Sequence, residues 1–249
     1  MKNSKLIIGL LLGIIIMIVA FIILFTTNTI SITSNNNTKN TNTKEKTDEQ
    51  STTNEDNTKS DEEKYSKIIG EYRNAMNDNE FNNSTNIEEK YPNINDNMMH
   101  FYHTDKSPTF NYVYYDINND NNNELIVGNE KSIYEIYTYD GNKPIRFFNE
   151  SCLGERCNAK IYDNGLIYFY GAGGASIHGL DFFKIASDGY SKETFKSYSV
   201  EYDENKNVTI TDNITKSKTN YTNDEEVISS LIDNAKEVDL TKLNWNEIK

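Results

Sequence analysis

The chain has 249 residues and a formal net charge of −13, with 38 acidic side chains against 25 lysines and arginines. This balance argues against a nucleic-acid binder, because affinity for phosphate backbones comes from lysine and arginine, and no basic stripe is present. Once a non-globular N-terminal region is set aside, the length suits one ordinary domain.

The first predicted element is a membrane-spanning helix from Leu6 to Phe25, a run without any charged residue. At a rise of about 1.5 Å per residue it covers the roughly 30 Å hydrocarbon thickness of a bilayer. Lys2 and Lys5 precede it, so the positive-inside tendency predicts a cytoplasmic N-terminus and an extracytoplasmic remainder. A cleavable signal peptide is the competing interpretation, but its apolar region is shorter, about 7–15 residues, and ends in a small-residue cleavage site, which this sequence lacks. We therefore expect residues 1–25 to be a cytoplasmic stub and an uncleaved single-pass anchor.

A polar segment, residues 26–59, follows the predicted anchor and has almost no apolar residue after Ile32. Such a composition buries too little apolar surface to offset the entropy of ordering, so it predicts a disordered stalk with a span of roughly 30 Å. Within the anchor, Gly9 and Gly13 form a Gly-x-x-x-Gly pair, a pattern that lets two helices approach closely. This pair suggests a homodimer, although two glycines at this spacing also arise by chance.

The remaining residues, 60–249, are predicted to form an extracytoplasmic globular domain that begins and ends with a helix. Ser60-Asp61-Glu62-Glu63 and Thr222-Asn223-Asp224-Glu225 both have the form of a capping box, and apolar residues follow each at helical spacing. A second short helix is possible around residues 95–102. The tail from Leu240 to Ile248 either adds a last strand or lies across the core, and the sequence leaves both open.

From Phe110 onward the apolar pattern changes to that of strands separated by turns. Glycine- or asparagine-containing turns interrupt this pattern at residues 140–142, 164–165, 188–189 and 203–207. Successive hairpins predict an antiparallel β meander. The expected fold class is therefore α+β, with the meander flanked by the N-terminal and C-terminal amphipathic helices.

One loop carries a candidate chemistry, because oxygen-bearing side chains alternate along it between two predicted strands. A Ca²⁺ ion takes six to eight oxygen ligands, which a tight loop with Asp or Asn at its first, third and fifth positions helps to supply. We expect Asn122 to contribute its backbone carbonyl, and Asn121 to replace the usual glycine in a left-handed conformation. The competing interpretation is an ordinary acidic turn in an asparagine-rich protein. The predicted metal ligands are Asp116, Asn118, Asp120, Asn122 and Glu124.

This loop resembles the calcium loops of FG-GAP and related β-propeller repeats, in which a short Asp/Asn loop joins two strands. It differs from an EF-hand because its flanks are strand-like and Val127 replaces the closing glutamate. Only one copy is present, so the resemblance does not imply a propeller. Asn-for-Asp replacements predict a weak site, with a Kd in the ~0.1–1 mM range of extracellular modules.

A wider resemblance runs from about residue 91 to residue 202. It includes the segments 110–117 and 124–128 and the glycine-rich run 171–176. This region is similar to a group of uncharacterised Gram-positive cell-surface proteins that are anchored to the membrane directly or by a lipid. The resemblance implies a location and carries over no catalytic residue. The cysteine pair of this chain is a departure from that group.

Cys152 and Cys157 are the only cysteines. Two ligands are too few for a zinc site, whereas an oxidising compartment would permit a small-loop disulfide; two free thiols are the alternative.

The leading hypothesis is a non-enzymatic, membrane-tethered domain of the bacterial cell envelope that binds or senses an unidentified ligand and is stabilised by one Ca²⁺. The alternative is a cell-surface hydrolase that uses Glu124 or His178. Such an enzyme would require a cleft that gathers His178, Asp181 and another acid.

Overall fold

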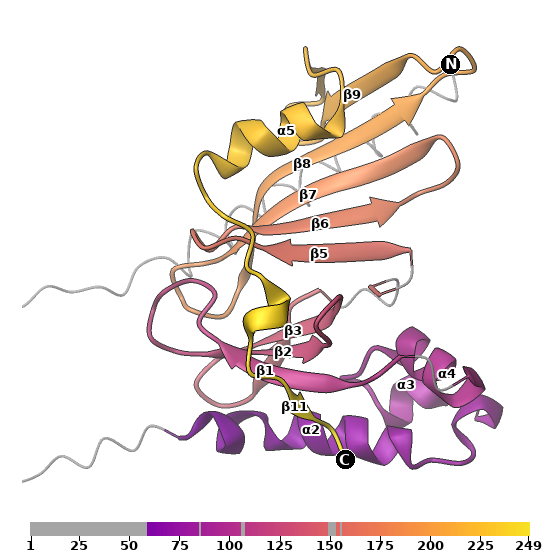
Figure 1. Cartoon of the computed structure of the whole chain (residues 1–249), viewed down its shortest axis with the longest axis vertical. Coiled ribbons are helices and arrows are strands. Elements are labelled where there is room, and N and C mark those ends of the chain that lie inside the picture. Colours follow the sequence, from indigo (N-terminus) through magenta and orange to yellow (C-terminus); the bar gives the residue numbers. More distant parts are fainter. Residues whose placement is uncertain (1–58, 85, 106–107, 149–152, 155) are drawn as a thin grey trace, which may run out of the picture. The chain divides into compact units, whose positions relative to one another are not determined.

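The structure is a computed structural model, and it describes residues 59–84, 86–105, 108–148, 153–154 and 156–249 (Figure 1). These residues belong to the unit Asp56–Lys249 and form an α+β fold with two antiparallel sheets and few helices. The predicted fold class is therefore confirmed at this level. The predicted anchor, the Gly9 and Gly13 pair and the stalk before Lys59 lie outside the described residues, as does Cys152.

The long helix α2 begins where the sequence predicts. Ser60 Oγ accepts a hydrogen bond from Glu63 N at 3.3 Å, and Glu63 Oε2 accepts one from Ser60 N at 3.0 Å, so the capping box is complete. The helical elements of the described residues are α2 (Asp61–Met76), η1 (Phe81–Asn83), α3 (Ile87–Lys90), α4 (Asp96–Asp105), α5 (Asp224–Ile232) and η2 (Leu240–Lys242).

Helix α5 begins one residue later than the second capping box predicts. Asn223 is the cap, and its Oδ1 accepts a hydrogen bond from Glu226 N at 2.9 Å. Glu226 in turn accepts hydrogen bonds from the backbone N and the hydroxyl of Thr222. Threonine and asparagine can both cap a helix. Here Thr222 is hydrogen-bonded to Glu226 before the first turn, and Asn223 is the residue that caps α5.

The strands form two sheets rather than one continuous meander. The first sheet has the order β11-β1-β2-β3-β4, and the second has the order β10-β9-β8-β7-β6-β5. The strands are β1 (Asn111–Tyr115), β2 (Glu124–Gly128), β3 (Ile133–Tyr139), β4 (Pro144–Arg146), β5 (Cys157–Ile161), β6 (Ile167–Ala172), β7 (Ile177–Ile185), β8 (Lys192–Tyr202), β9 (Val208–Asp212), β10 (Ser217–Lys218) and β11 (Asn246–Glu247).

The division falls between β4 and β5. Phe147 and Phe148 follow β4 directly, are 3% exposed, and belong to a core cluster with residues of both sheets. The chain thus leaves the first sheet with two aromatic side chains that pack between the sheets, and it then starts the second sheet. Within each sheet consecutive strands are antiparallel neighbours, so the predicted hairpins are present.

Tight turns with left-handed backbone connect several of these hairpins. The φ angles of Gly141, Gly165 and Gly189 are 87°, 79° and 79°. Glycine adopts such angles without the steric cost that a Cβ would add. These turns fall at the predicted positions between β3 and β4, β5 and β6, and β7 and β8.

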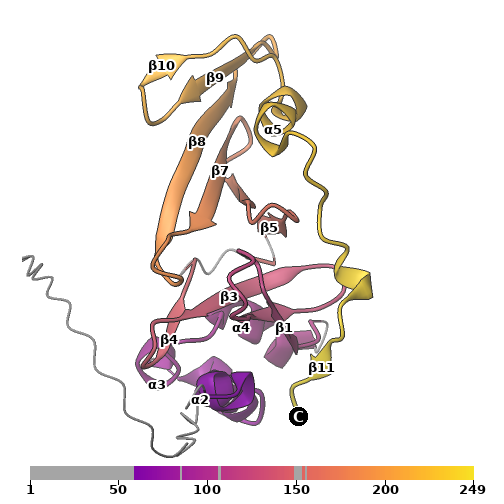
Figure 2. The same cartoon turned by 90° about the vertical axis from the view of Figure 1, so that its left-hand side faces the viewer.

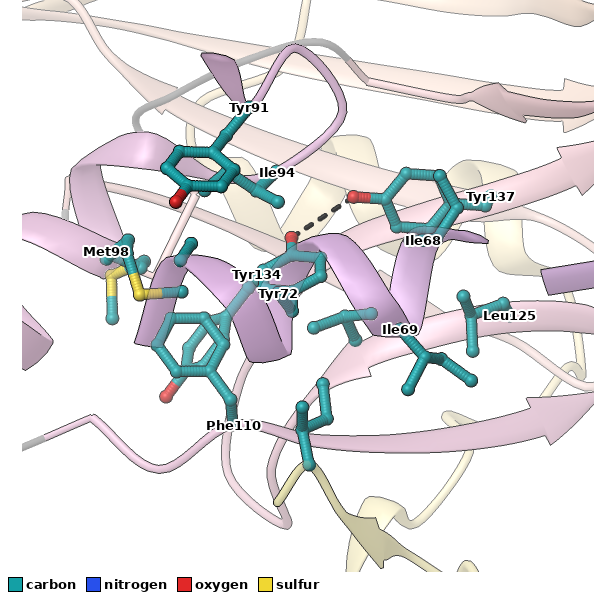
Figure 3. Packing of buried hydrophobic residues seen from close by; sticks show 14 of the residues in the cluster. Ile68, Ile69, Tyr72, Tyr91, Ile94, Met98, Phe110, Leu125, Tyr134 and Tyr137 are labelled. Atoms are coloured by element: carbon teal, nitrogen blue, oxygen red, sulfur yellow. Dashed lines mark hydrogen bonds between the residues drawn. The ribbon is translucent and has the colours of Figure 1, made fainter. Parts of the chain in front are cut away.

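Three buried clusters hold the elements together. Helices α2 to α4 pack on one face of the first sheet, where the hydroxyls of Tyr72 and Tyr137 lie 3.1 Å apart (Figure 3). The second cluster joins the two sheets. In the third, α5 lies on the second sheet (Figure 2). Val227 of this helix is fully buried.

The C-terminal tail adds a strand, one of the two outcomes that the sequence left open. Strand β11 pairs antiparallel with β1, with Asn111 opposite Glu247, and Ile248 N donates to Phe110 O at 3.1 Å. The end of the chain thereby closes one edge of the first sheet.

Candidate functional site

The predicted ligand residues lie in the hairpin loop between β1 and β2. Asp116 accepts hydrogen bonds from Asp120 N at 3.1 Å and from Asn121 N at 2.9 Å. Asn118 Oδ1 accepts a hydrogen bond from Asp120 N at 3.2 Å, and Asp120 Oδ1 accepts one from Asn122 N at 2.7 Å. These short-range bonds arise because Asp and Asn side chains satisfy backbone N–H groups two or more residues ahead. The loop therefore curls around its own oxygen-bearing side chains.

Two asparagines adopt left-handed backbone and allow this curl. The φ angles of Asn119 and Asn121 are 61° and 68°. Asparagine tolerates this region better than most residues other than glycine. The predicted left-handed conformation at Asn121 is thus confirmed.

Glu124 closes the loop from the first position of β2. Glu124 is only 2% exposed, and its Oε2 accepts a hydrogen bond from Ile117 N at 2.8 Å. Burial, together with the nearby charges of Asp120 and Asp116, raises the pKa of Glu124 to about 8. The charges of Asp120 and Asp116 therefore add to burial in disfavouring the charged form of Glu124.

The donor set is chemically suited to a hard cation. It offers carboxylate, amide and carbonyl oxygens from five alternating positions, the ligand types that Ca²⁺ prefers. A carboxylate has about four acceptor sites, so the hydrogen bonds from backbone N–H groups leave lone pairs on Asp116 and Asp120. Among the residues that the structure describes, no three His, Cys, Asp or Glu side chains are grouped to hold a metal ion. The fit therefore depends on the amide and carbonyl oxygens as well as on the carboxylates.

A cavity of about 490 Å³ lies beside this loop. Its other walls are the start of α2, the β3–β4 turn and the β7–β8 turn, which are far apart in the sequence. Aromatic rings and carboxylates line much of it, with two lysines at one wall: Tyr65, Tyr139, Tyr190, Asp120, Glu124, Asp140, Asp188, Lys59 and Lys64. The loop is therefore one wall of a polar, mainly acidic hollow rather than an isolated turn.

The carboxylates of this cavity differ in their electrostatic state. A backbone hydrogen bond from Lys143 lowers the pKa of Asp140, and hydrogen bonds from Ser191 lower the pKa of Asp188. Both groups are therefore ionised at neutral pH. Glu124 differs because its pKa is raised, and its Oε2 accepts a hydrogen bond from the backbone N–H of Ile117.

The residues of the hydrolase alternative do not come together. His178 and Asp181 are three residues apart in the regular part of β7, so their side chains point to opposite faces of the sheet. His178 Nε2 lies 2.8 Å from Asp224 Oδ2 of α5, and its ring packs between Tyr170 and Tyr202. Glu124 belongs to the other sheet. Among the described residues, His178 therefore lies beside Asp224 rather than on the face of the sheet that carries Asp181.

Cys157 is disulfide-bonded, and Cys152 is the only other cysteine of the chain. This favours the disulfide over the free thiols. Such a bridge closes a short loop, and its expected contribution is about 2 kcal/mol or less.

One charged pair was not anticipated from the sequence. Glu135 is completely buried in β3, and its Oε2 accepts a hydrogen bond from Arg146 Nε of β4 at 2.6 Å. A single acidic residue inside the apolar run Ile133–Tyr137 is the signal that could have revealed it, because buried carboxylates need a partner.

None of the helices that the structure describes between residues 59 and 249 has the length and apolar character of a bilayer-spanning segment. Comparisons of the chain with protein families, with curated proteins and with solved structures found no match.

Proposed function

We propose that this protein is a membrane-tethered extracytoplasmic domain of the bacterial cell envelope that binds or senses an envelope or extracellular ligand. Its β1–β2 loop holds one Ca²⁺ that stabilises the domain. The observation that carries this proposal is the curled loop from Asp116 to Glu124, in which Asp116 and Asp120 accept hydrogen bonds from the loop backbone and Glu124 is a buried carboxylate at the loop's end.

The tether and its orientation are supported by the sequence. Residues 6–25 are uncharged and apolar, and Lys2 and Lys5 precede them. A polar segment then separates this run from the start of α2. The polar composition of residues 26–59 suits a spacer that holds a domain away from a lipid surface.

Ca²⁺ chemistry fits the loop because a divalent cation offsets the mutual repulsion of its carboxylates. Asp116, Asn118 and Asp120 would hold the ion by side-chain oxygens, Asn122 by its backbone carbonyl and Glu124 by its carboxylate. The ion would neutralise the carboxylates and hold the loop in one conformation, and it would not act on a substrate. The adjoining cavity of about 490 Å³ is the natural place for a small polar ligand.

Thermal unfolding of residues 60–249 tests the calcium site. We expect about 10 mM Ca²⁺ to raise the midpoint by about 3–10 °C over a chelator control, because an ion bound only by the folded state at ~0.1–1 mM affinity stabilises that state. Asp116→Ala should abolish this shift.

The matched control is Asp203→Ala, because Asp203 makes similar bonds to backbone N–H groups in the β8–β9 turn but lies outside the loop. This variant should keep the calcium-dependent shift. Identical curves with calcium and with chelator for the unsubstituted protein would reject the site.

Protease treatment of intact cells tests the tether and its orientation. External protease should remove residues 60–249 from the cell surface and leave a short membrane-embedded fragment, because the anchor keeps only its N-terminal end inside. Full protection of the domain would contradict the proposed orientation, and a soluble chain that begins after Thr26 would contradict the tether.

A further inference from the structure

A second cavity, of about 710 Å³, lies at the end of β1 and β2 opposite the β1–β2 loop. Its walls come from α4, the start of β1, the β2–β3 turn and β3, and it shares no lining residue with the cavity beside the loop. Cavities of roughly 300–1,000 Å³ are the size that holds small molecules in proteins. The lining residues that bear on recognition are Phe101, Thr109, Asn111, Asn129, Ser132 and Tyr134.

Two of these residues bring aromatic rings to the cavity. Phe101 of α4 is 37% exposed, one of the few large hydrophobic side chains on the surface of the described residues. Tyr134 of β3 is only 3% exposed, and its ring packs on that of Phe110 with the ring centroids 5.3 Å apart (Figure 3). The cavity therefore joins an exposed ring to a buried one and offers apolar surface to one face of a ligand.

The hydroxyl of Tyr134 is held in place, but its proton is not used within the fold. Asn129 Nδ2 donates a hydrogen bond to Tyr134 Oη at 2.6 Å. Asn129 Oδ1 accepts hydrogen bonds from Lys131 N at 2.9 Å and from Ser132 N at 3.1 Å, so the β2–β3 turn fixes this asparagine. Among the described residues, the hydroxyl proton of Tyr134 has no acceptor. Since buried polar groups are normally hydrogen-bonded, the cavity is where a ligand oxygen would reach this proton.

Three further side chains of the lining are polar and neutral. Thr109, Asn111 and Ser132 supply two hydroxyls and one amide. Within the part of the chain that the structure describes, none of these three side chains makes a hydrogen bond. Hydroxyls and amides can both donate and accept, as the hydroxyls of a sugar do. The cavity therefore combines apolar rings with several uncommitted groups of the kind that bind hydroxyls.

Two other classes of ligand fit this lining less well. An extended peptide would need a free strand edge, but the edge of β1 at this cavity is paired with β11, where Asn111 lies opposite Glu247. A highly charged ligand would need an excess of one sign, whereas the exposed charged side chains of the lining have both signs. They are Asp105, Glu130 and Lys131.

We propose that this cavity binds a neutral saccharide, with the C–H face of a sugar ring on Phe101 and sugar hydroxyls on the polar side chains. Tyr134 Oη donates to one sugar hydroxyl, and Asn111 and Ser132 bind others. The inference goes beyond the proposed function, because it uses a different cavity and none of the predicted calcium ligands. The sugar would come either from a polymeric glycan of the envelope or from a free saccharide in the surroundings.

Saturation-transfer NMR on the full chain in lipid nanodiscs tests the site, with chelator present so that calcium plays no part. The probes are three neutral trisaccharides: maltotriose, cellotriose and chitotriose. We expect the ring C–H protons of at least one of them to be saturated by the protein and not by empty nanodiscs. Retention of the chain on the corresponding polymers, starch, cellulose and chitin, would indicate a polymeric glycan, and trisaccharide binding without retention would indicate a free saccharide.

Substitutions locate the bound sugar. Phe101→Ala should weaken its binding by about tenfold or more, because the apolar surface under the sugar ring is lost, whereas Phe101→Tyr should preserve it. The matched control is Phe195→Ala, since Phe195 is 39% exposed and lies outside the cavity. Asn111→Ala should weaken binding by about threefold to tenfold through the loss of one or two hydrogen bonds, with Asn158→Ala on β5 as its control.

Three results would overturn the proposal. The first is saturation of none of the trisaccharides together with retention on none of the polymers. The second is equal affinity of the Phe101→Ala chain and the unsubstituted chain, because the sugar would then bind elsewhere. The third is binding of trialanine, a neutral peptide probe, without binding of any trisaccharide, which would make the cavity a peptide site. Each of these results leaves the calcium-dependent melting unaffected, so the two proposals fail separately.

Discussion

Two glutamates are buried on neighbouring strands of the first sheet, and their surroundings differ. Glu135 accepts hydrogen bonds from Arg146 Nε at 2.6 Å and from Ile136 N and Phe148 N, both at 3.0 Å. Glu124 accepts a hydrogen bond from Ile117 N and faces two further carboxylates. The charge of Glu135 is balanced within the chain, whereas the charge of Glu124 is opposed by its neighbours. The first carboxylate has its counter-charge on the neighbouring strand, whereas the second has two like charges nearby.

The comparison predicts the largest effect for Arg146→Met. Removal of the guanidinium leaves Glu135 charged or forces it to take up a proton in a completely buried position, so the free energy of unfolding should fall by about 3–5 kcal/mol. Urea unfolding at pH 7 measures this loss. The double variant Glu135→Leu/Arg146→Met should lose less than Arg146→Met alone, since it removes the buried charge as well. A single-variant loss below about 1 kcal/mol would show that the pair is not the partner that Glu135 needs.

The second prediction concerns the pH dependence that Glu124 imposes in the presence of chelator. Burial and the charges of Asp120 and Asp116 raise the pKa of Glu124 from 4.5 to about 8, so between these values the folded state holds a proton that the unfolded chain has released. Stability must therefore fall as the pH rises through this window. Relative to Glu124→Gln, the unsubstituted protein should lose roughly 3–4 kcal/mol between pH 5 and pH 8.

Urea unfolding of both proteins at several pH values measures this difference in the free energy of unfolding. Because other titrating groups contribute equally to both proteins, their contributions cancel. Parallel pH curves would mean that Glu124 ionises as an ordinary surface carboxylate. In that case the contrast with Glu135 would lose its basis.

The features that the sequence predicted correctly are local ones. The cap at Ser60, the left-handed backbone at Asn121 and the turns at Gly141, Gly165 and Gly189 all follow from what a residue does to its near neighbours. The curl at Asp116 belongs to the same class, because the hydrogen bonds to Asp116 and Asp120 join residues two to five apart.

The features that escaped prediction depend on long-range pairing. The alternation of polar and apolar residues identifies strands but does not say where one sheet ends, so the break after Phe148 was not foreseen. His178 pairs with Asp224, 46 residues away, rather than with a carboxylate of its own strand. The cavity was missed for the same reason, because the walls at Tyr65 and Tyr190 meet the loop only in the folded chain.

The smallest expected effect comes from Tyr72→Phe, which removes one hydroxyl beside Glu135. Tyr72 Oη accepts a hydrogen bond from Asn95 N at 3.0 Å and lies 3.1 Å from Tyr137 Oη (Figure 3). Loss of the hydroxyl leaves the buried N–H of Asn95 without this acceptor, which should cost about 1–2 kcal/mol. Because no group of altered charge is involved, the loss should be the same at pH 5 and pH 8, in contrast to the effect of Glu124→Gln. A loss that grows with pH would show that the tyrosine hydroxyls help to stabilise the charge of Glu135. The hydroxyls of Tyr72 and Tyr137 would then count, with Arg146, among the groups that distinguish Glu135 from Glu124.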